Sequence, residues 1–126
     1  MKVLLVNGSS REKGCTYTAL SEVAHSLEEE GIKTEIIFIG NKPLSDCTAC
    51  GKCRETGECV FHDIANELVE KAKTADGFVF GSPVYYAHPS GRLLTALDRA
   101  FYSGSRYFAH KPGAAVLSAR RAGTTA

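Results

Sequence analysis

Short apolar segments alternate along this chain with longer segments whose apolar residues recur at helical spacing. Strands that are covered on both faces of a sheet read as short, continuous apolar runs, often rich in β-branched residues. Four segments fit that description, at residues 3–6, 34–39, 77–80 and 114–118. Alternation of such strands with helices is typical of βαβ units. The chain is therefore predicted to be an α/β protein with a doubly wound parallel sheet, open at its edges and with helices on both faces.

Three helices are expected between these strands. The first has an apolar stripe between residues 20 and 27, and Gly31 is placed to end it. Asp63 can cap the second helix, and Ser90 can cap a third that runs to about Phe101. Ligands of open parallel sheets bind beyond the carboxyl ends of the strands. The loops after the first, third and fourth strands are therefore the expected binding site.

The composition fits one soluble domain that covers residues 1–126. Apolar residues make up 44% of the chain, enough for a single core. The net charge is +1, with both signs mixed, so nucleic acid and acidic membranes are not expected partners. The N-terminal apolar run is too short for a signal peptide, and no stretch is long enough to cross a bilayer. Unpaired cysteines without a targeting segment indicate a reducing cytoplasm.

A cysteine-rich loop, residues 43–61, is inserted after the second strand. It contains four of the five cysteines, at spacings C-x2-C-x2-C-x5-C, namely Cys47, Cys50, Cys53 and Cys59. Two intervening residues let consecutive thiolates turn toward one centre, and Gly51 and Gly57 let the backbone bend around it. Four soft sulfur ligands favour an iron–sulfur cluster or zinc. Zinc sites usually split their ligands into two distant C-x-x-C pairs, so a single [4Fe–4S] cluster is the preferred interpretation.

Three alternatives for this loop stay open. The thiols can bind zinc, or they can be reduced and hold no metal. A disulfide framework is the third, and it is disfavoured because the number of cysteines is odd and nothing marks the chain as secreted. The spacing therefore indicates a metal site more strongly than it identifies the metal.

The loop after the first strand has the character of a phosphate site. It joins a strand to a helix, so backbone N–H groups and the helix N-terminus face an anion there. Ser9, Ser10 and Thr16 add hydroxyl groups, and Arg11 can neutralise a phosphate charge. The loop is neither a Walker A motif nor a G-x-G-x-x-G motif. A monophosphate ester fits it better than a triphosphate, although an ordinary polar turn is the competing interpretation.

The loop after the third strand suggests what the phosphate is attached to. Pro83 stiffens the backbone, and Tyr85 and Tyr86 offer flat faces to an aromatic ring. Beside a phosphate loop, these residues indicate a planar cofactor with a phosphate tail. FMN has that shape.

Two motifs together resemble the flavodoxin-like NADPH-dependent FMN reductase superfamily, over essentially the whole chain. They are Gly8-Ser9-Ser10-Arg11-x-x-Gly14-x-Thr16 and Gly81-Ser82-Pro83-Val84-Tyr85-Tyr86 with Gly91. The cysteine loop is similar to that of the superfamily's iron–sulfur flavoprotein branch. A flavodoxin-like sheet requires five strands, and the chain shows four. We therefore expect a sheet that is truncated after the fourth strand.

The resemblance implies a set of binding residues. The FMN phosphate is expected at Ser9, Arg11 and Thr16, with Ser10 and Cys15 lining the same loop, although the family often has asparagine in place of Cys15. Along the ribityl chain and the ring it places Pro83, Val84, Tyr85, Tyr86 and Ala87. The third loop contributes Ser118, Arg120 and Gly123, and the four cysteines match the cluster ligands.

The implied function is that of an FMN-dependent oxidoreductase in which a cluster relays electrons between a donor, such as NAD(P)H, and an acceptor. No protein acid or base is predicted to be catalytic, because the flavin performs the chemistry. His88 lies near the expected ring. Lys52 and Arg54 beside the cysteines suggest docking of an acidic carrier such as ferredoxin. Asp98 and Arg99 are expected to form a surface or interface pair. A homo-oligomer is implied by the resemblance alone.

Two other classes of function compete with this one. A pure electron carrier would have no substrate of its own, and it would react only with protein donors. A flavin-binding protein whose cysteine loop is structural would contain zinc or no metal.

Overall fold

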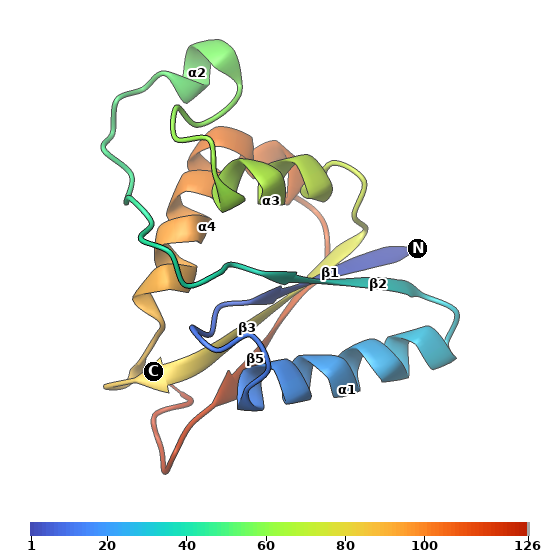
Figure 1. The fold of residues 1–126 in the computed structure, drawn as a ribbon. Coiled ribbons are helices and arrows are strands. Elements are labelled where there is room, and N and C mark those ends of the chain that lie inside the picture. Colours follow the sequence, from blue (N-terminus) through green and yellow to red (C-terminus); the bar gives the residue numbers. More distant parts are fainter. Residues whose placement is uncertain (126) are drawn as a thin grey trace.

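The computed structural model describes residues 1–125 and contains a central parallel sheet with helices on both faces (Figure 1). Its elements, in chain order, are β1 (Lys2–Asn7), α1 (Cys15–Glu29), β2 (Lys33–Phe38), α2 (Cys53–Thr56), α3 (Ile64–Ala72), β3 (Gly77–Tyr85), β4 (His88–Pro89), α4 (Gly91–Gly104), the 3₁₀ helix η1 (Ser105–Tyr107) and β5 (Gly113–Ser118).

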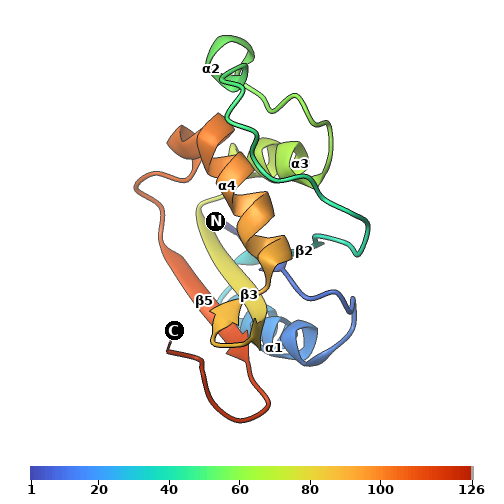
Figure 2. The same ribbon diagram turned by 90° about the vertical axis from the view of Figure 1, so that its left-hand side faces the viewer.

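The sheet confirms the predicted doubly wound, flavodoxin-like fold. Its four parallel strands lie in the order β2-β1-β3-β5, and the short β4 pairs antiparallel with the end of β3. Figures 1 and 2 show α1 on one face of the sheet and α3 with α4 on the other. The first strand is central, so its carboxyl end lies between its neighbours. The loops after β1, β3 and β5 consequently meet at one edge.

Alternation of side chains along the strands divides the core in two. Leu4 and Phe78 face α3 and α4, where helix residues such as Leu68 and Ala96 complete the larger cluster. On the opposite face, Leu5 and Val79 pack with residues of α1. Burial on both faces explains why these strands read as continuous apolar runs.

The predicted helix ends are largely confirmed. The Asp63 carboxylate accepts a hydrogen bond from the Ala65 N–H, and the Ser90 hydroxyl accepts one from Leu93 N. Gly31 follows α1 with a φ of 75°, the left-handed conformation typical of a residue just beyond a helix end. The third predicted helix, α4, continues beyond Phe101 to Gly104.

The prediction that the third strand ends at residue 80 was wrong. The strand continues to Tyr85, turns, and pairs with β4 as a hairpin in which Tyr85 faces His88. The two turn residues, Tyr86 and Ala87, have φ values of 47° and 64°, which a tight two-residue hairpin turn requires. Pro83 hid this extension, because proline inside a strand is normally an argument against it.

Glu35 on the edge strand β2 links two other elements by ion pairs. Its carboxylate lies 2.6 Å from Lys2 Nζ and 2.6 Å from Lys71 Nζ. Hydrogen bonds from Lys2 and Lys71 hold the pKa of Glu35 below its ordinary value. The hydrogen bond to Glu35 likewise raises the pKa of Lys71. The charged forms of both partners are therefore favoured by folding.

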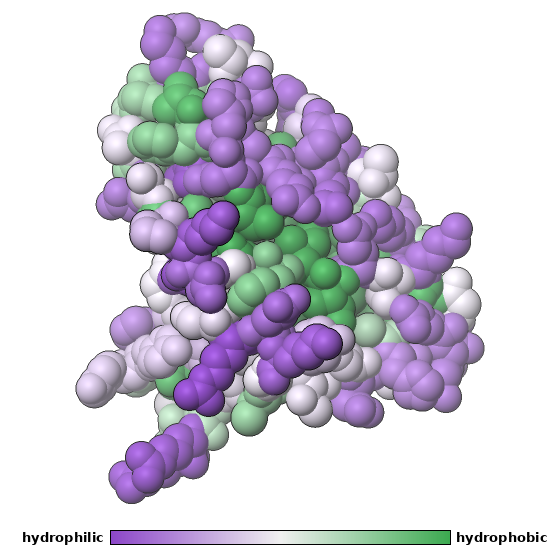
Figure 3. All heavy atoms as spheres, viewed as in Figure 1, coloured by the Kyte–Doolittle hydropathy of each residue, from purple (hydrophilic) through white to green (hydrophobic). Residues whose placement is uncertain are grey.

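The cysteine loop leaves the sheet after β2 and passes along α4 before it reaches α3 (Figures 1 and 2). It contains one element that the sequence did not predict, the single-turn helix α2. Figure 3 shows apolar residues gathered at this end of the molecule, where the exposed side chains include Cys47, Cys50 and Val60. No helix within residues 1–125 combines the length and the apolar content needed to cross a membrane.

Candidate functional site

The loop between β1 and α1 is organised by one buried side chain, Asn7. Its Oδ1 accepts a hydrogen bond from Ser9 N at 3.0 Å, and its Nδ2 donates one to the Glu12 carbonyl at 3.0 Å. The Ser9 hydroxyl then accepts a hydrogen bond from Arg11 N at 3.1 Å. Asn7 is fully buried. Sequence reasoning missed it, although a polar residue at the end of a buried strand was a visible signal.

The N-terminus of α1 opens into the same loop. Gly14 is the N-cap and provides no side-chain cap, so the first-turn N–H groups lack the side-chain partner that helices usually have. Thr16, buried in the first turn, shares a hydrogen bond of 3.0 Å with Ser118 at the end of β5. The start of α1 and the end of β5 are thereby joined, and the arrangement suits an anion.

One pocket of about 290 Å³ collects most of the residues predicted to bind the cofactor. It is lined by Gly14 and by eight predicted residues, which are Ser9, Ser10, Arg11, Cys15, Thr16, Pro83, Tyr85 and Ser118. They come from the ends of β1, β3 and β5 and from the start of α1. The expectation that three separate loops meet at one site therefore agrees with the fold.

Five predicted residues lie outside that pocket, namely Val84, Tyr86, Ala87, Arg120 and Gly123. Tyr86 and Ala87 occupy the hairpin turn, and Tyr86 is 100% exposed. Gly123 packs on this hairpin, since a Cβ placed on it would lie 3.2 Å from Val84 Cγ1. Arg120 is exposed in the segment after β5. These residues lie in the hairpin or in the segment after β5 and do not line the pocket.

Close backbone contacts hold the strand ends in register below the pocket. Gly8 N donates to the Gly81 carbonyl at 2.8 Å, and a Cβ on Gly81 would lie only 2.6 Å from a methyl carbon of Leu20. The Ser90 hydroxyl donates to the Gly8 carbonyl at 2.6 Å, and Ser90 N donates to the Ser82 hydroxyl at 2.8 Å. The start of α4 is thus fixed to the phosphate loop.

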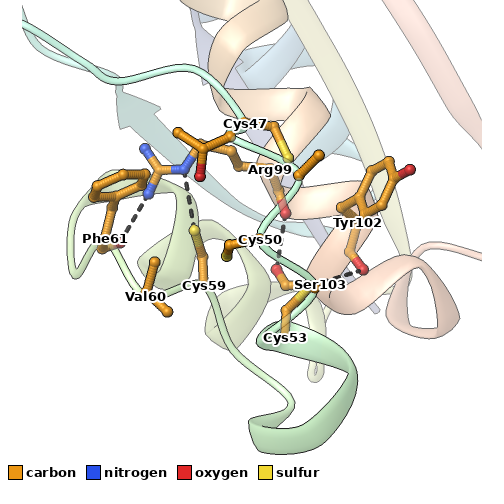
Figure 4. Close-up of a pocket in the computed structure, with 12 residues that line it drawn as sticks. Cys47, Cys50, Cys53, Cys59, Val60, Phe61, Arg99, Tyr102 and Ser103 are labelled. Atoms are coloured by element: carbon orange, nitrogen blue, oxygen red, sulfur yellow. Dashed lines mark hydrogen bonds between the residues drawn. The ribbon is translucent and has the colours of Figure 1, made fainter.

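A second pocket is formed by the cysteine loop and the C-terminal half of α4. All four loop cysteines line it, together with Arg99, Tyr102 and Ser103 of α4 (Figure 4). The sulfur of Cys53 donates a weak hydrogen bond to the Tyr102 carbonyl at 3.7 Å. Within residues 1–125, however, no three Cys, His, Asp or Glu side chains are grouped closely enough to hold a metal ion. The donor set fits a four-sulfur centre, and ligation requires the loop to contract.

Cys59 is the most firmly placed of the four cysteines. Its backbone N–H donates to Asn66 Oδ1 at 3.1 Å, and its carbonyl accepts from Asn66 Nδ2 at 2.8 Å. Its sulfur accepts a hydrogen bond from Arg99 Nε at 3.2 Å. Cys47 and Cys50, in contrast, are exposed. The C-terminal cysteine of the loop is therefore held by side chains of α3 and α4, in contrast to Cys47 and Cys50.

The prediction that Asp98 and Arg99 form a surface or interface pair was wrong. Asp98 is exposed, whereas Arg99 is only 1% exposed and pairs with Asp63 across two hydrogen bonds of 2.7 and 2.8 Å. Burial by itself lowers the pKa of Arg99, but hydrogen bonds to Asp63 and Cys59 outweigh it and raise that pKa. The position follows from helix geometry, because Arg99 lies three residues after the buried Ala96.

The other charged residues considered above lie at the surface. Lys52 forms an ion pair of 3.5 Å with Glu55, and Arg54 is exposed on α2. His88 is exposed in the hairpin, and its Nδ1 bonds the Pro89 carbonyl. All five cysteines are unpaired as disulfides. The structure leaves the roles of these charged side chains as predictions.

Comparison with known proteins finds a matching family model and several related proteins. A family model described as NADPH-dependent FMN reductase matches residues 1–126. An iron–sulfur flavoprotein of Methanocaldococcus jannaschii is 40% identical over 100 residues, which cover 79% of this chain and 52% of the relative. An iron–sulfur flavoprotein of Methanosarcina thermophila is 32% identical over 118 residues, covering 92% of this chain and 62% of the relative.

A solved structure extends the agreement to the fold. The NAD(P)H:quinone oxidoreductase from Methanothermobacter marburgensis superimposes with a TM-score of 0.72 at 19% identity, covering 94% of this chain and 65% of that one. At such low identity the likeness concerns the fold. The chain spans about half the length of the curated relatives it matches, from 52% to 62% for the two described above.

Proposed function

Because the chain belongs to the NADPH-dependent FMN reductase family, we propose that it is the flavin-binding part of an oxidoreductase that moves electrons between a reduced donor and an acceptor. The observation that carries this proposal is the pocket at the carboxyl edge of the sheet. Eight residues that sequence alone assigned to FMN line it, and the N-terminus of a 15-residue helix opens into it. FMN supplies hydride acceptance and single-electron transfer when it is bound.

The residues of the pocket have separable roles in this proposal. Arg11 and the first-turn N–H groups of α1 bind the phosphate by charge and by hydrogen bonds. The hydroxyls of Ser9 and Thr16 orient it. Tyr85 and Pro83 also line the pocket, and in this proposal they limit access of water to the ring. No acid or base is assigned, since the protein's task is to bind and orient the cofactor.

For the second pocket we propose a [4Fe–4S] cluster held by Cys47, Cys50, Cys53 and Cys59. Support comes from the four thiols that line one cavity and from the name of the two archaeal relatives, iron–sulfur flavoprotein. Helix α4 connects the two pockets. Ser90 bonds the phosphate loop at its start, and Arg99 lies at the cysteines, roughly 14 Å further along the axis at about 1.5 Å per residue. This arrangement suits a relay between cluster and flavin.

Steady-state and single-turnover reduction by NADPH and NADH tests the proposed activity. An enzyme of this family should reduce its bound FMN rapidly with one of the two nucleotides and pass electrons to an artificial acceptor. A chain that accepts electrons only from a reduced protein donor would instead be a carrier. A chain that turns over with NADPH while its loop contains zinc would be an FMN reductase with a structural cysteine loop.

Docking of an acidic carrier such as ferredoxin is a further part of the proposal. It rests on the position of Lys52 and Arg54 beside the cysteines, although Glu55 already neutralises part of that charge. Reversing both charges should slow electron transfer from reduced ferredoxin, with a strong salt dependence in the unmodified chain. Unchanged transfer would remove this docking role. A homo-oligomer and a cytoplasmic location stay predictions.

A further inference from the structure

A single guanidinium group lies between the two ends of the cysteine loop. Arg99 Nη1 donates to the Ser45 carbonyl at 3.1 Å, and Nη2 donates to the Phe61 carbonyl at 2.8 Å. Its remaining N–H groups bond both carboxylate oxygens of Asp63 and the sulfur of Cys59. All five donors of the group are thereby used.

These contacts join segments that are distant in sequence. Ser45 precedes the first cysteine ligand, and Phe61 follows the last one. The Phe61 ring also covers the guanidinium, 5.1 Å from its central carbon. Figure 4 shows the guanidinium between Phe61 and the sulfur of Cys59. One side chain from α4 therefore bonds both stems of the loop, the segments before Cys47 and after Cys59.

Only arginine can make this set of contacts. A lysine ammonium is a compact charge with three donors, so it can pair with Asp63 but cannot bond two carbonyls, a carboxylate and a sulfur in one plane. The side chain is also buried, so water does not replace a lost partner easily. Asp63 balances the positive charge at this position. What distinguishes arginine from lysine here is therefore the planar, forked arrangement of its five N–H donors.

We propose that Arg99 is the positioning residue of the cysteine loop: it holds the two stems together and donates a hydrogen bond to the Cys59 sulfur in the assembled site. The second half of this proposal rests on the proposed cluster, whereas the first half concerns the loop alone. Hydrogen bonds to ligating sulfurs raise the reduction potential of iron–sulfur sites. Arg99 therefore biases the site toward its reduced state.

The test compares three variants. Arg99→Lys keeps the charge and loses the fork. The double variant Arg99→Met with Asp63→Asn removes both charges, keeps a residue that can cap α3, and so guards against failure to fold. Arg106→Met is the control, because Arg106 is exposed and its side chain bonds only the neighbouring Tyr107.

Hydrogen–deuterium exchange of the metal-free chain tests the first half. Peptides covering residues 43–61 should exchange roughly tenfold faster in Arg99→Lys and in the double variant than in the wild type or the control. Peptides covering β1 and β3 should be unchanged. Equal exchange of residues 43–61 in all four proteins would overturn the proposal that Arg99 holds the two stems together.

Anaerobic reconstitution with iron and sulfide tests the second half. Both variants at position 99 should retain less than half of the wild-type iron, and the cluster that does form should have a more negative reduction potential. A wild-type potential in Arg99→Lys would overturn the assigned hydrogen bond. A wild type that takes up no iron would contradict the proposed cluster. The exchange experiment would still decide whether Arg99 holds the two stems of the loop together.

Discussion

Replacing Asn7 by alanine should lower the free energy of unfolding by about 2 kcal/mol and weaken FMN binding. The buried Ser9 N–H loses its acceptor, the Asn7 amide oxygen at 3.0 Å, at a cost of about 1–3 kcal/mol for an unsatisfied buried donor. The Glu12 carbonyl belongs to an exposed residue and can turn to water, so its loss adds little. For a chain of this size the melting temperature should fall by roughly 6–10 °C.

The effect on FMN follows from the same contacts. If the ordered loop is needed for the phosphate, up to about 2 kcal/mol must be spent to restore it, which weakens binding by as much as roughly 30-fold. Titration followed by quenching of FMN fluorescence measures this change. Thermal melts followed by circular dichroism measure the loss of stability in the same samples.

Asn66→Ala is the matched control. The Asn66 side chain bonds the backbone N–H and carbonyl of Cys59, as the Asn7 side chain bonds backbone groups of the loop after β1. This variant should reduce the iron content after reconstitution and leave the FMN dissociation constant within about twofold of the wild type, since Asn66 bonds the backbone of Cys59 whereas Asn7 bonds Ser9 and Glu12. Wild-type FMN affinity in Asn7→Ala would refute the reasoning. So would an equal loss of FMN and iron in both variants, which would indicate general unfolding.

Two further predictions concern stability. Gly104→Ala places a Cβ 2.5 Å from Val69 Cγ1 and should cost about 1–3 kcal/mol, and adding Val69→Ala should recover part of that loss in urea unfolding. Hydrogen bonds from Lys2 and Lys71 lower the pKa of Glu35. The stability that these ion pairs contribute is therefore present above the ordinary carboxyl pKa of 4.5, and it is lost as pH falls through the folded-state pKa. Glu35→Gln should therefore reduce stability at pH 7 by up to about 1 kcal/mol and leave it nearly unchanged at the acid end, whereas an equal effect at both pH values would contradict this assignment.

The parts of the fold that sequence could predict are those in which local pattern and tertiary structure agree. The central strands are apolar because both of their faces are covered, and Asp63 and Ser90 are capping residues that do cap. The meeting of the loops after β1, β3 and β5 at one pocket could be predicted for the same reason. The carboxyl ends of parallel strands lie at one edge of the sheet, so residues that follow separate strands are expected to lie together.

The parts that sequence did not predict depend on long-range contacts. Sequence predicts Arg99 in a surface or interface pair with Asp98, whereas its carboxylate partner, Asp63, lies at the start of another helix. The position of Arg99 on the buried stripe was the signal that could have identified it. Asn7 acts through backbone groups of its own loop, which no residue pattern specifies. The extension of β3 past Phe80 became visible only through its pairing with β5 as far as Pro83 and with β4 beyond it.

The most direct test of the central claim is the ratio of FMN and iron to protein after purification and reconstitution without oxygen. We predict about one FMN and about four irons per chain, with flavin absorption bands above a broad shoulder from sulfur-to-iron charge transfer. FMN together with zinc, or without any metal, would contradict the relay and reduce the protein to a flavin reductase with a structural cysteine loop. Iron without FMN would contradict the pocket assignment at the carboxyl edge of the sheet.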